Sequence, residues 1–177
     1  MATTPHSTTV KTIWMIGHSN HRLEDFISLL ERHEIRCLVD IRSSPYSRFP
    51  HFTGASLSRS LERRGIQYHH EPTLGGKEDF PPEHRADALD RVLAMPSRMV
   101  LMCSEGDYHA CHRSYWIAPL VVKAGCRVLQ ILKDGSAEED RGDSRAPSPT
   151  AGGRGKGAVR RESPQQGLLW EPEQGAS

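Results

Sequence analysis

Short apolar runs alternate with stretches of helical periodicity over most of the chain. In the helical stretches, apolar side chains recur every three or four residues, as Leu23, Phe26, Ile27 and Leu30 do, and this spacing predicts helices with one buried face. The apolar runs are short and continuous, which predicts buried strands. The predicted strands cover residues 12–16, 37–39, 66–69, 99–102 and 127–132, and the predicted helices cover residues 22–33, a stretch around Leu57 and Leu61 that ends at Gly65, residues 82–94 and residues 111–123.

This alternation of strands and helices is typical of a parallel sheet with helices on both faces. Parallel neighbours need a long crossover connection, and a helix between two strands supplies it. The sequence therefore predicts an α/β fold: a single three-layer domain over residues 12–133 with a mainly parallel, about five-stranded sheet. The order of the strands does not follow from the pattern.

Polar segments flank the predicted domain. Residues 1–11 are polar and without periodicity, and we expect them to form a flexible leader. Residues 134–164 are rich in Gly, Ser, Pro and charged residues, and they hold almost no large apolar side chain. Such a segment buries too little surface to offset its ordering entropy. We therefore expect a disordered linker over residues 134–164, followed by a tail over residues 165–177.

Composition and charge exclude several classes of protein. The formal net charge is +1, so no global field attracts the chain to nucleic acid or to a membrane surface, although local patches still can. The sequence has no apolar run of the roughly 18 residues that span a bilayer and no pattern of a signal peptide. The cysteines Cys37, Cys103, Cys111 and Cys126 lack the spacing of a secreted disulfide framework. We expect a cytoplasmic protein with no membrane partner.

Polar and reactive side chains follow four of the predicted strands. The segments Gly17–Asn20, Asp40–Ser43, Leu74–Gly76 and Cys103–Arg113 carry His, Ser, Asp, Arg, Gly and Cys, whereas an ordinary solvated edge carries Lys and Glu. The carboxyl ends of parallel strands meet at one edge, and open α/β sheets bind their ligands there. The sequence therefore predicts one composite site at this edge.

Several arginines in these segments suit an anion. Arg42 and Arg48 are separated by a loop rich in serine, and a guanidinium group binds two oxygens of a phosphate or carboxylate at once. Arg113 lies near the start of a predicted helix, where free N–H groups favour an anion. The alternative is that Arg42 pairs with Asp40 or Glu105 and only holds its loop in place.

Three side chains are candidates for proton transfer. His18 ordinarily titrates near neutral pH, which suits a general base; the alternative is a histidine whose hydrogen bonds hold the turn. Asp40 and Glu105 are candidate acids or bases of the same rank. Gly75 and Gly76 allow the backbone to approach a ligand closely, or they form a plain turn.

The two cysteines of the Cys103–Arg113 segment admit three interpretations. Cys111 at a helix start, next to His112, has the surroundings that lower a thiol pKa and produce a nucleophile or redox thiol. Together, Cys103, His109, Cys111 and His112 offer donors for zinc or iron, although their spacing matches no common zinc pattern. The third interpretation is that both thiols are packed in the interior and inert. No cofactor is favoured.

The ordered motifs resemble the domain-of-unknown-function family numbered four-eight-eight. The motifs are I-G-H-S at Ile16–Ser19, V-D-I-R-S-S-P at Val39–Pro45, S-R-F-P-H-F at Ser47–Phe52, L-G-G at Leu74–Gly76, C-S-E at Cys103–Glu105 and C-H-R at Cys111–Arg113. The resemblance implies an α/β fold, no specific reaction, and a loose association with DNA repair. It places the family's motif residues on His18, Ser19, Asp40, Arg42, Cys103, Glu105, Cys111, His112 and Arg113.

A short apolar island lies near the end of the chain. Gln166, Leu169 and Trp170 resemble the Gln-x-x-Leu-Phe peptide by which bacterial repair proteins dock on the DNA sliding clamp, with Trp in place of Phe. A flexible tether raises the effective concentration of such a peptide near its partner. The alternative is a last packing strand of the domain.

The leading hypothesis from the sequence is an enzyme that acts on a phosphate-bearing substrate, such as a nucleotide or damaged DNA. The alternatives are a non-catalytic adaptor that binds nucleic acid or protein, and a sensor based on thiols or a metal. In the leading hypothesis, His18, Asp40, Glu105 and Cys111 carry the chemistry. The expected substrate-binding residues are Ser19, Arg42, Ser43, Arg48, Gly75, Gly76, His112 and Arg113.

Overall fold

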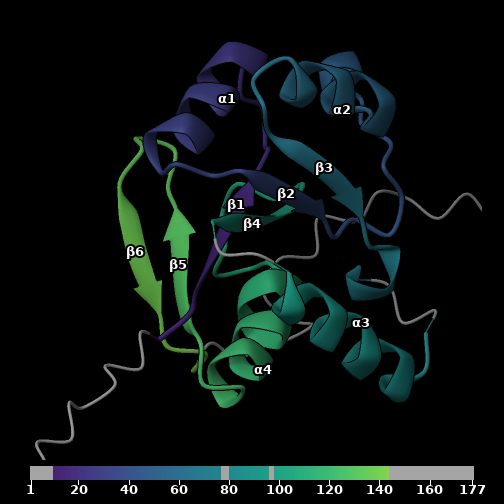
Figure 1. Cartoon of the computed structure of the whole chain (residues 1–177), viewed down its shortest axis with the longest axis vertical. Helices are drawn as coiled ribbons and strands as arrows, with labels where there is room; N and C mark the ends of the chain where they lie inside the picture. The colour runs from purple at the N-terminus through teal and green to yellow at the C-terminus, as the bar shows by residue number, and fades with distance from the viewer. Residues whose placement is uncertain (1–9, 77–79, 96–97, 144–177) are drawn as a thin grey trace, which may run out of the picture. The chain divides into compact units, whose positions relative to one another are not determined.

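A six-stranded sheet lies at the centre of the described part of the chain, which comprises residues 10–76, 80–95 and 98–143 of a computed structural model (Figure 1). The strand order is β3-β2-β4-β1-β5-β6. Neighbours from β3 to β5 are parallel, and β6 runs antiparallel to β5. The predicted α/β class with a mainly parallel sheet is confirmed. The strands are β1 (Thr12–Gly17), β2 (Cys37–Asp40), β3 (Gln67–His70), β4 (Met99–Cys103), β5 (Arg127–Ile131) and β6 (Ala137–Asp140).

Helices cover both faces of this sheet. The apolar side chains of α1 and α2 pack on one face, and those of α3 and α4 pack on the other. Figure 1 shows the two pairs on opposite sides of the strands. The three-layer prediction is therefore confirmed. The helices are α1 (Leu23–Arg32), α2 (Gly54–Glu62), α3 (Pro82–Ala94) and α4 (Ala118–Lys123), with short 3₁₀ turns at Pro50–Phe52 and Pro72–Leu74.

The direction of the connections reverses at β4. The chain leaves β1 and β2 toward α1 and α2 on one face, but it leaves β4 toward α4 on the other face. Because β4 lies between β1 and β2 in the sheet, a crevice opens beyond the carboxyl ends of these three strands. Open α/β sheets bind their ligands at such a switch point.

The loops after β1 and β4 are joined beyond the ends of the strands. The His18 N–H donates to Cys103 O over 2.9 Å, and the Ser19 N–H donates to Ser104 O over 3.0 Å. Gly17 allows this close approach, because a Cβ atom there would lie 1.6 Å from Glu105 O. A side chain at position 17 would thus force the two loops apart.

The helix after β4 begins with a wider turn than its periodicity predicts. The sequence predicts a regular helix over residues 111–123, but Arg113–Ile117 is π-helical and the α-helix begins at Ala118. The Ala118 N–H donates to Arg113 O, five residues back. Pro119 has no N–H and cannot donate to the carbonyl four residues before it, so the regular pattern is interrupted there. π-helical turns of this kind are frequent at functional sites.

The sixth strand moves the end of the folded domain beyond the predicted boundary at residue 133. The sequence predicts about five strands and a disordered linker from residue 134, whereas Ala137–Asp140 pairs with β5. Asp140 is 5 % exposed, and its Oδ2 accepts from Ser114 Oγ over 2.6 Å and from Gln130 Nε2 over 2.9 Å. Hydrogen bonds to Asp140 hold this strand in the sheet. A prediction from the spacing of apolar residues therefore does not detect it.

Several predictions concern the ends of the chain. Residues 1–9 of the expected leader and residues 144–177 lie outside the described residues. The expected docking peptide, with Gln166, Leu169 and Trp170, therefore stays a prediction. Among the helices of the described ranges, none combines the length and apolar character needed to span a membrane.

We expect Asp140→Ala to lower the free energy of unfolding by about 2 to 3 kcal/mol, because a buried amide and a buried hydroxyl lose their acceptor. The matched control is Glu139→Ala on the same strand. Within the described residues, Glu139 pairs with a half-exposed Arg127, so its removal should cost about 0.5 kcal/mol or less. Urea unfolding followed by circular dichroism measures both. Equal losses would show that the buried hydrogen bonds of Asp140 add no more stability than the exposed ion pair of Glu139.

Candidate functional site

A polar hollow of about 610 Å³ lies beyond the carboxyl ends of β1, β2 and β4. Of the predicted site residues, it brings together His18, Ser19, Arg48 and Glu105. The loops after these three strands supply its whole lining, so the hollow occupies the switch point of the sheet. We call it the site hollow. Its lining residues are His18, Ser19, Asn20, Tyr46, Ser47, Arg48, Phe49, Ser104, Glu105 and Gly106.

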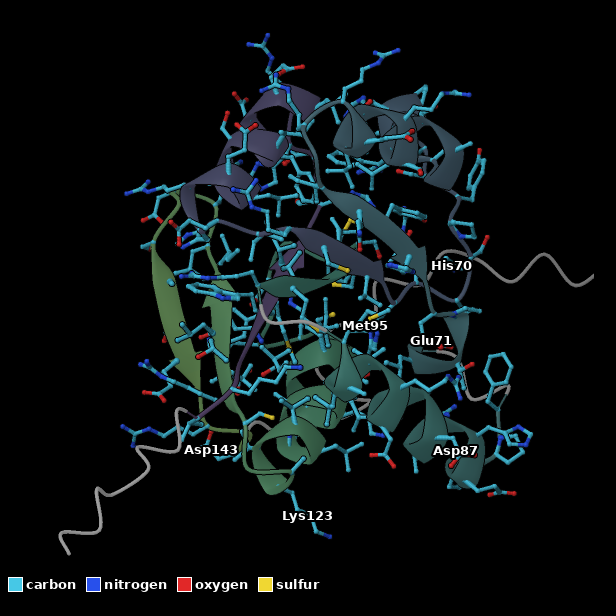
Figure 2. The ribbon with its side chains drawn as sticks, in the orientation of Figure 1. His70, Glu71, Asp87, Met95, Lys123 and Asp143 are labelled. Carbon is cyan, nitrogen blue, oxygen red and sulfur yellow. The ribbon has the colours of Figure 1, made fainter. Side chains whose placement is uncertain are left out.

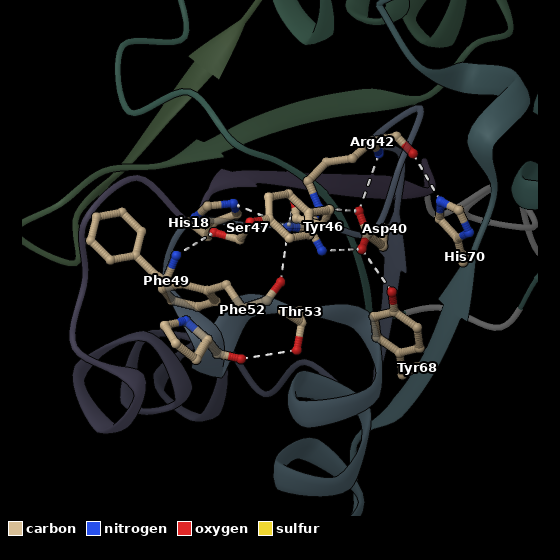
Figure 3. Close-up of polar contacts among 11 residues, drawn as sticks. His18, Asp40, Arg42, Tyr46, Ser47, Phe49, Phe52, Thr53, Tyr68 and His70 are labelled. Atoms are coloured by element: carbon tan, nitrogen blue, oxygen red, sulfur yellow. Dashed lines mark hydrogen bonds and ion pairs between the residues drawn. The ribbon is translucent and has the colours of Figure 1, made fainter.

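A buried ion pair lies beneath the site hollow. Both Asp40 and Arg42 are buried, and the guanidinium group donates from Nε to Asp40 Oδ1 over 2.8 Å and from Nη2 to Asp40 Oδ2. The Tyr68 hydroxyl also donates to Asp40 Oδ2 over 2.7 Å, and Figure 3 shows it pointing at this carboxylate. The Arg42 N–H also donates to Asp40 Oδ1 over 3.1 Å, so four donor atoms offset the cost of burying this carboxylate.

The remaining donor atom of Arg42 is also engaged. Nη1 donates to Phe52 O over 2.9 Å and lies 3.3 Å from His18 Nε2. His70, labelled at the end of β3 in Figure 2, contacts Arg42 O through Nε2 over 2.8 Å. Arg42 thus makes the pairing with Asp40 that the alternative interpretation predicts, and its anion-binding role stays a prediction.

His18 has the contacts of a structural histidine. Its ring is stacked on Phe52 with 4.5 Å between centroids. Nδ1 lies 3.0 Å from Ser19 O, so it carries the proton, and Nε2 then accepts from Arg42. Burial lowers the pKa of His18 to about 4, and the neighbouring Arg42 charge adds to this effect. These contacts favour the interpretation of His18 as the residue that holds the turn, not as a general base.

A smaller set of side chains reaches solvent in the site hollow. Arg48 is exposed, with its guanidinium carbon 5.0 Å above the Phe49 ring. Ser104 and Glu105 are exposed at the end of β4, and Ser104 Oγ donates to Glu105 Oε1 over 3.3 Å. Ser19 holds φ at 44°, in the left-handed region that few non-glycine residues adopt. A ligand would meet these groups first.

Arg113 faces the protein interior. It is 1 % exposed, and Nε donates to Gln130 Oε1 over 3.0 Å. Nη1 donates to Cys103 Sγ and, over 2.7 Å, to Glu105 O, while Nη2 donates to Gly106 O. Arg113 therefore holds the wall of the site hollow from behind, and its contacts do not support the predicted role as a ligand for an anion.

The two cysteines of this segment lie in contact. Cys103 Sγ is 3.2 Å from Cys111 Sγ, and both thiols are free and buried. The hydrogen bond from Cys103 lowers the pKa of Cys111 to about 4, with further contributions from His112 and Arg113. Burial raises the pKa of Cys103. Of the two, Cys111 is therefore the thiol with nucleophilic character.

The glycine pair after β3 belongs to a second, smaller cavity. Gly75 packs on Ser43, where a Cβ atom would lie 2.2 Å from Ser43 Oγ. Gly76 and His112 line a cavity of about 190 Å³ that shares no lining residue with the site hollow. The residues of the predicted composite site are thus divided among three places: the site hollow, the buried hydrogen bonds around Arg42 and Arg113, and this cavity.

The described residues do not form a metal centre from the predicted donors. No group of three or more His, Cys, Asp or Glu side chains in the described ranges converges as a metal site would. His109 lies in an exposed loop, with its ring 4.0 Å from the Tyr108 ring, whereas Cys103 and Cys111 are buried. The four predicted ligands are therefore not brought to one point.

Sequence reasoning missed several side chains that build this region: Tyr68, Gln130 and Asn20, and also Tyr46, Ser47, Phe49 and Ser104 of the lining. Tyr68 reaches Asp40 because residues 67–70 of β3 pair in register with residues 37–40 of β2. Gln130 links Arg113 to Asp140 from within an apolar strand. Asn20 ends the first polar cluster and lines the site hollow. A polar residue inside an apolar strand was the available signal for Gln130, whereas Tyr68 depends on strand order.

The low pKa of His18 predicts a pH dependence of stability. Unfolded His18 takes up a proton near its ordinary pKa of 6.5, but the folded protein resists protonation down to about pH 4. The unfolded state binds more protons in this window, so the free energy of unfolding falls as the pH drops from 6.5 toward 4. We expect His18→Gln to flatten this dependence, and His69→Gln, at an exposed position, to retain it. Urea unfolding at several pH values measures the slopes, and parallel slopes for all three proteins would contradict the assignment.

One known family matches part of this chain. The sequence model described as Domain of unknown function DUF488 matches residues 22–92. This range contains Asp40, Arg42, Arg48 and the Gly75–Gly76 pair but not Cys103 to Arg113. Neither the curated proteins nor the solved structures include a match. Over residues 22–92, this α/β chain therefore resembles the DUF488 family.

Proposed function

We propose that this protein is an enzyme that acts on a phosphate-bearing substrate, with a nucleotide unit bound in the site hollow. One observation carries the proposal: a polar hollow at the switch point of a parallel sheet, where α/β proteins bind their ligands. Its volume of about 610 Å³ lies within the range of small-molecule sites, roughly 300 to 1,000 Å³.

The exposed groups of the site hollow suit a phosphate ester. Arg48 is the exposed arginine of the lining, and its guanidinium can bind two phosphate oxygens at once. The hydroxyl groups of Ser19, Ser47 and Ser104 stand in the same lining and can donate to the remaining oxygens. The Arg48 guanidinium lies over the Phe49 ring, whereas the exposed Tyr46 of the same lining offers an aromatic face on which a base can stack.

Glu105 is the proposed proton-transfer residue. It is the exposed carboxylate of the lining, and its Oε1 accepts from Ser104 Oγ. The main chain around it is fixed, because Arg113 donates to Glu105 O. A fixed backbone and a free carboxylate are what a general base requires. Arg42, Asp40 and His18 then serve as the buried support of the site.

We expect Arg48→Ala to weaken the binding of a nucleoside monophosphate about tenfold or more, because a charge-assisted hydrogen bond to the phosphate is lost. The matched control is Arg59→Ala on the exposed side of α2, which should bind like the wild type. Isothermal titration calorimetry measures both, first with the free nucleotide and then with a short single-stranded oligonucleotide.

The two titrants separate the sources of the phosphate. Binding of the mononucleotide alone identifies a free nucleotide as substrate, and tighter binding of the oligonucleotide identifies a nucleotide within DNA. If the wild type binds neither compound, or if Arg48→Ala binds both as well as the wild type does, the proposal is wrong.

A further inference from the structure

The pair of buried cysteines at the end of β4 is not used by the proposed function. Cys103 is the last residue of β4, and Cys111 precedes the π-helical turn that starts at Arg113. Their sulfurs lie 3.2 Å apart, and neither lines the site hollow. Two thiols at this distance across one loop can be joined by a modest movement of side chains.

The charge of Arg113 calls for a negative partner next to this pair. Arg113 is 1 % exposed, and within the described residues it forms no ion pair with a carboxylate. The Gln130 amide lies between Arg113 and Asp140: its oxygen accepts from Arg113, and its nitrogen donates to Asp140. A buried cation without a counterion is costly. A thiolate at Cys111 would balance this charge, because its sulfur lies 3.2 Å from the Cys103 sulfur to which Arg113 Nη1 donates.

The hydrogen bonds distinguish the two sulfurs. Cys103 Sγ accepts from Arg113 Nη1 and can donate its one hydrogen to Cys111 Sγ over 3.2 Å, so it fits the protonated partner. Cys111 Sγ lies 3.6 Å from His112 Nδ1 and can accept from Cys103. The lowered pKa of Cys111 agrees with this arrangement. Cys111 is thus the thiolate that reacts first, and Cys103 is the thiol that reacts with the oxidised Cys111 in the second step.

We propose that Cys103 and Cys111 form a redox-active dithiol, which a peroxide converts to an intramolecular disulfide. The Cys111 thiolate attacks one oxygen of the peroxide, the O–O bond breaks, and the second oxygen leaves as hydroxide or alkoxide. Cys111 is then a sulfenic acid. Cys103 sulfur attacks it, the S–O bond breaks, and the Cys103 proton leaves with the departing oxygen as water. The dithiol loses two electrons, and the peroxide gains them.

The surroundings favour a small oxidant. Both sulfurs are buried, so a bulky disulfide compound cannot contact them without opening the loop. The His112 ring contacts Cys111 on one side and lines the cavity of about 190 Å³ on the other. His112 Nε2 has no hydrogen-bond partner among the described residues. A peroxide molecule could hydrogen-bond to this nitrogen as it passes from the cavity to the Cys111 thiolate.

The test uses the full chain and the tryptic peptide from Met99 to Arg113, which carries both cysteines. Reduced protein is treated with hydrogen peroxide, denatured, alkylated, digested and analysed by mass spectrometry. We expect this peptide to lose two hydrogens and to take no alkyl group, while the separate peptides of Cys37 and Cys126 remain alkylated. Treatment with a dithiol reductant should restore both alkylation sites.

Variants assign the order of the two thiols. Cys103→Ser should accumulate a sulfenic acid at Cys111 that dimedone labels, whereas Cys111→Ser should leave Cys103 labelled at least about tenfold less. Cys126→Ser is the matched control, and it should form the disulfide as the wild type does. Because the main readout uses unaltered protein, a variant that fails to fold does not affect it.

Three results would overturn the proposal. The first is a wild-type peptide that still takes two alkyl groups at a peroxide dose that oxidises Cys37 or Cys126, since the pair would then be inert packing. The second is a disulfide between Cys103 or Cys111 and another cysteine. The third is zinc retained by both sulfurs in native mass spectrometry, because a metal would then hold the thiolates.

Discussion

The burial of Arg113 is the constraint on which this end of the molecule depends. A single guanidinium group connects the end of β4, the loop over Glu105 and Gly106, and Gln130 of β5. A buried charge is tolerated only when its donors are satisfied. The loop after β4 therefore curls around Arg113, and that curl creates both the wall of the site hollow and the contact between the two cysteines.

A second buried cation organises the neighbouring loops. Arg42 is paired with Asp40 and bound to the carbonyl of Phe52, so the segment after β2 is held against the loop after β1. His18 lies between them, uncharged near neutral pH because burial lowers its pKa. The two arginines thus act as supports, and the groups left for a ligand are those at the surface of the site hollow, above all Arg48 and Glu105.

Most of the fold could be predicted from the pattern of apolar positions, because burial on two sheet faces leaves a direct record in the sequence. The strands β1, β2, β4 and β5 and the helices, including α3 at residues 82–94, follow from it, whereas β3 is a largely exposed edge strand. The exceptions are polar. β6 is held by Asp140, Ser114 and Gln130, and hydrogen bonds between distant residues leave no periodic signal.

The site was only partly predictable for the same reason. By itself, the sequence determined the class of fold and the edge of the sheet at which reactive side chains gather, since apolar periodicity and strand ends are local properties. Only the tertiary structure decided which of these side chains are buried and hydrogen-bonded inside the protein. Strand order brings Tyr68 to Asp40, and the curl of the loop after β4 brings Arg113 to Cys103. The role of a charged group depends on its partners and its burial, and both are set by neighbours that are distant in the sequence.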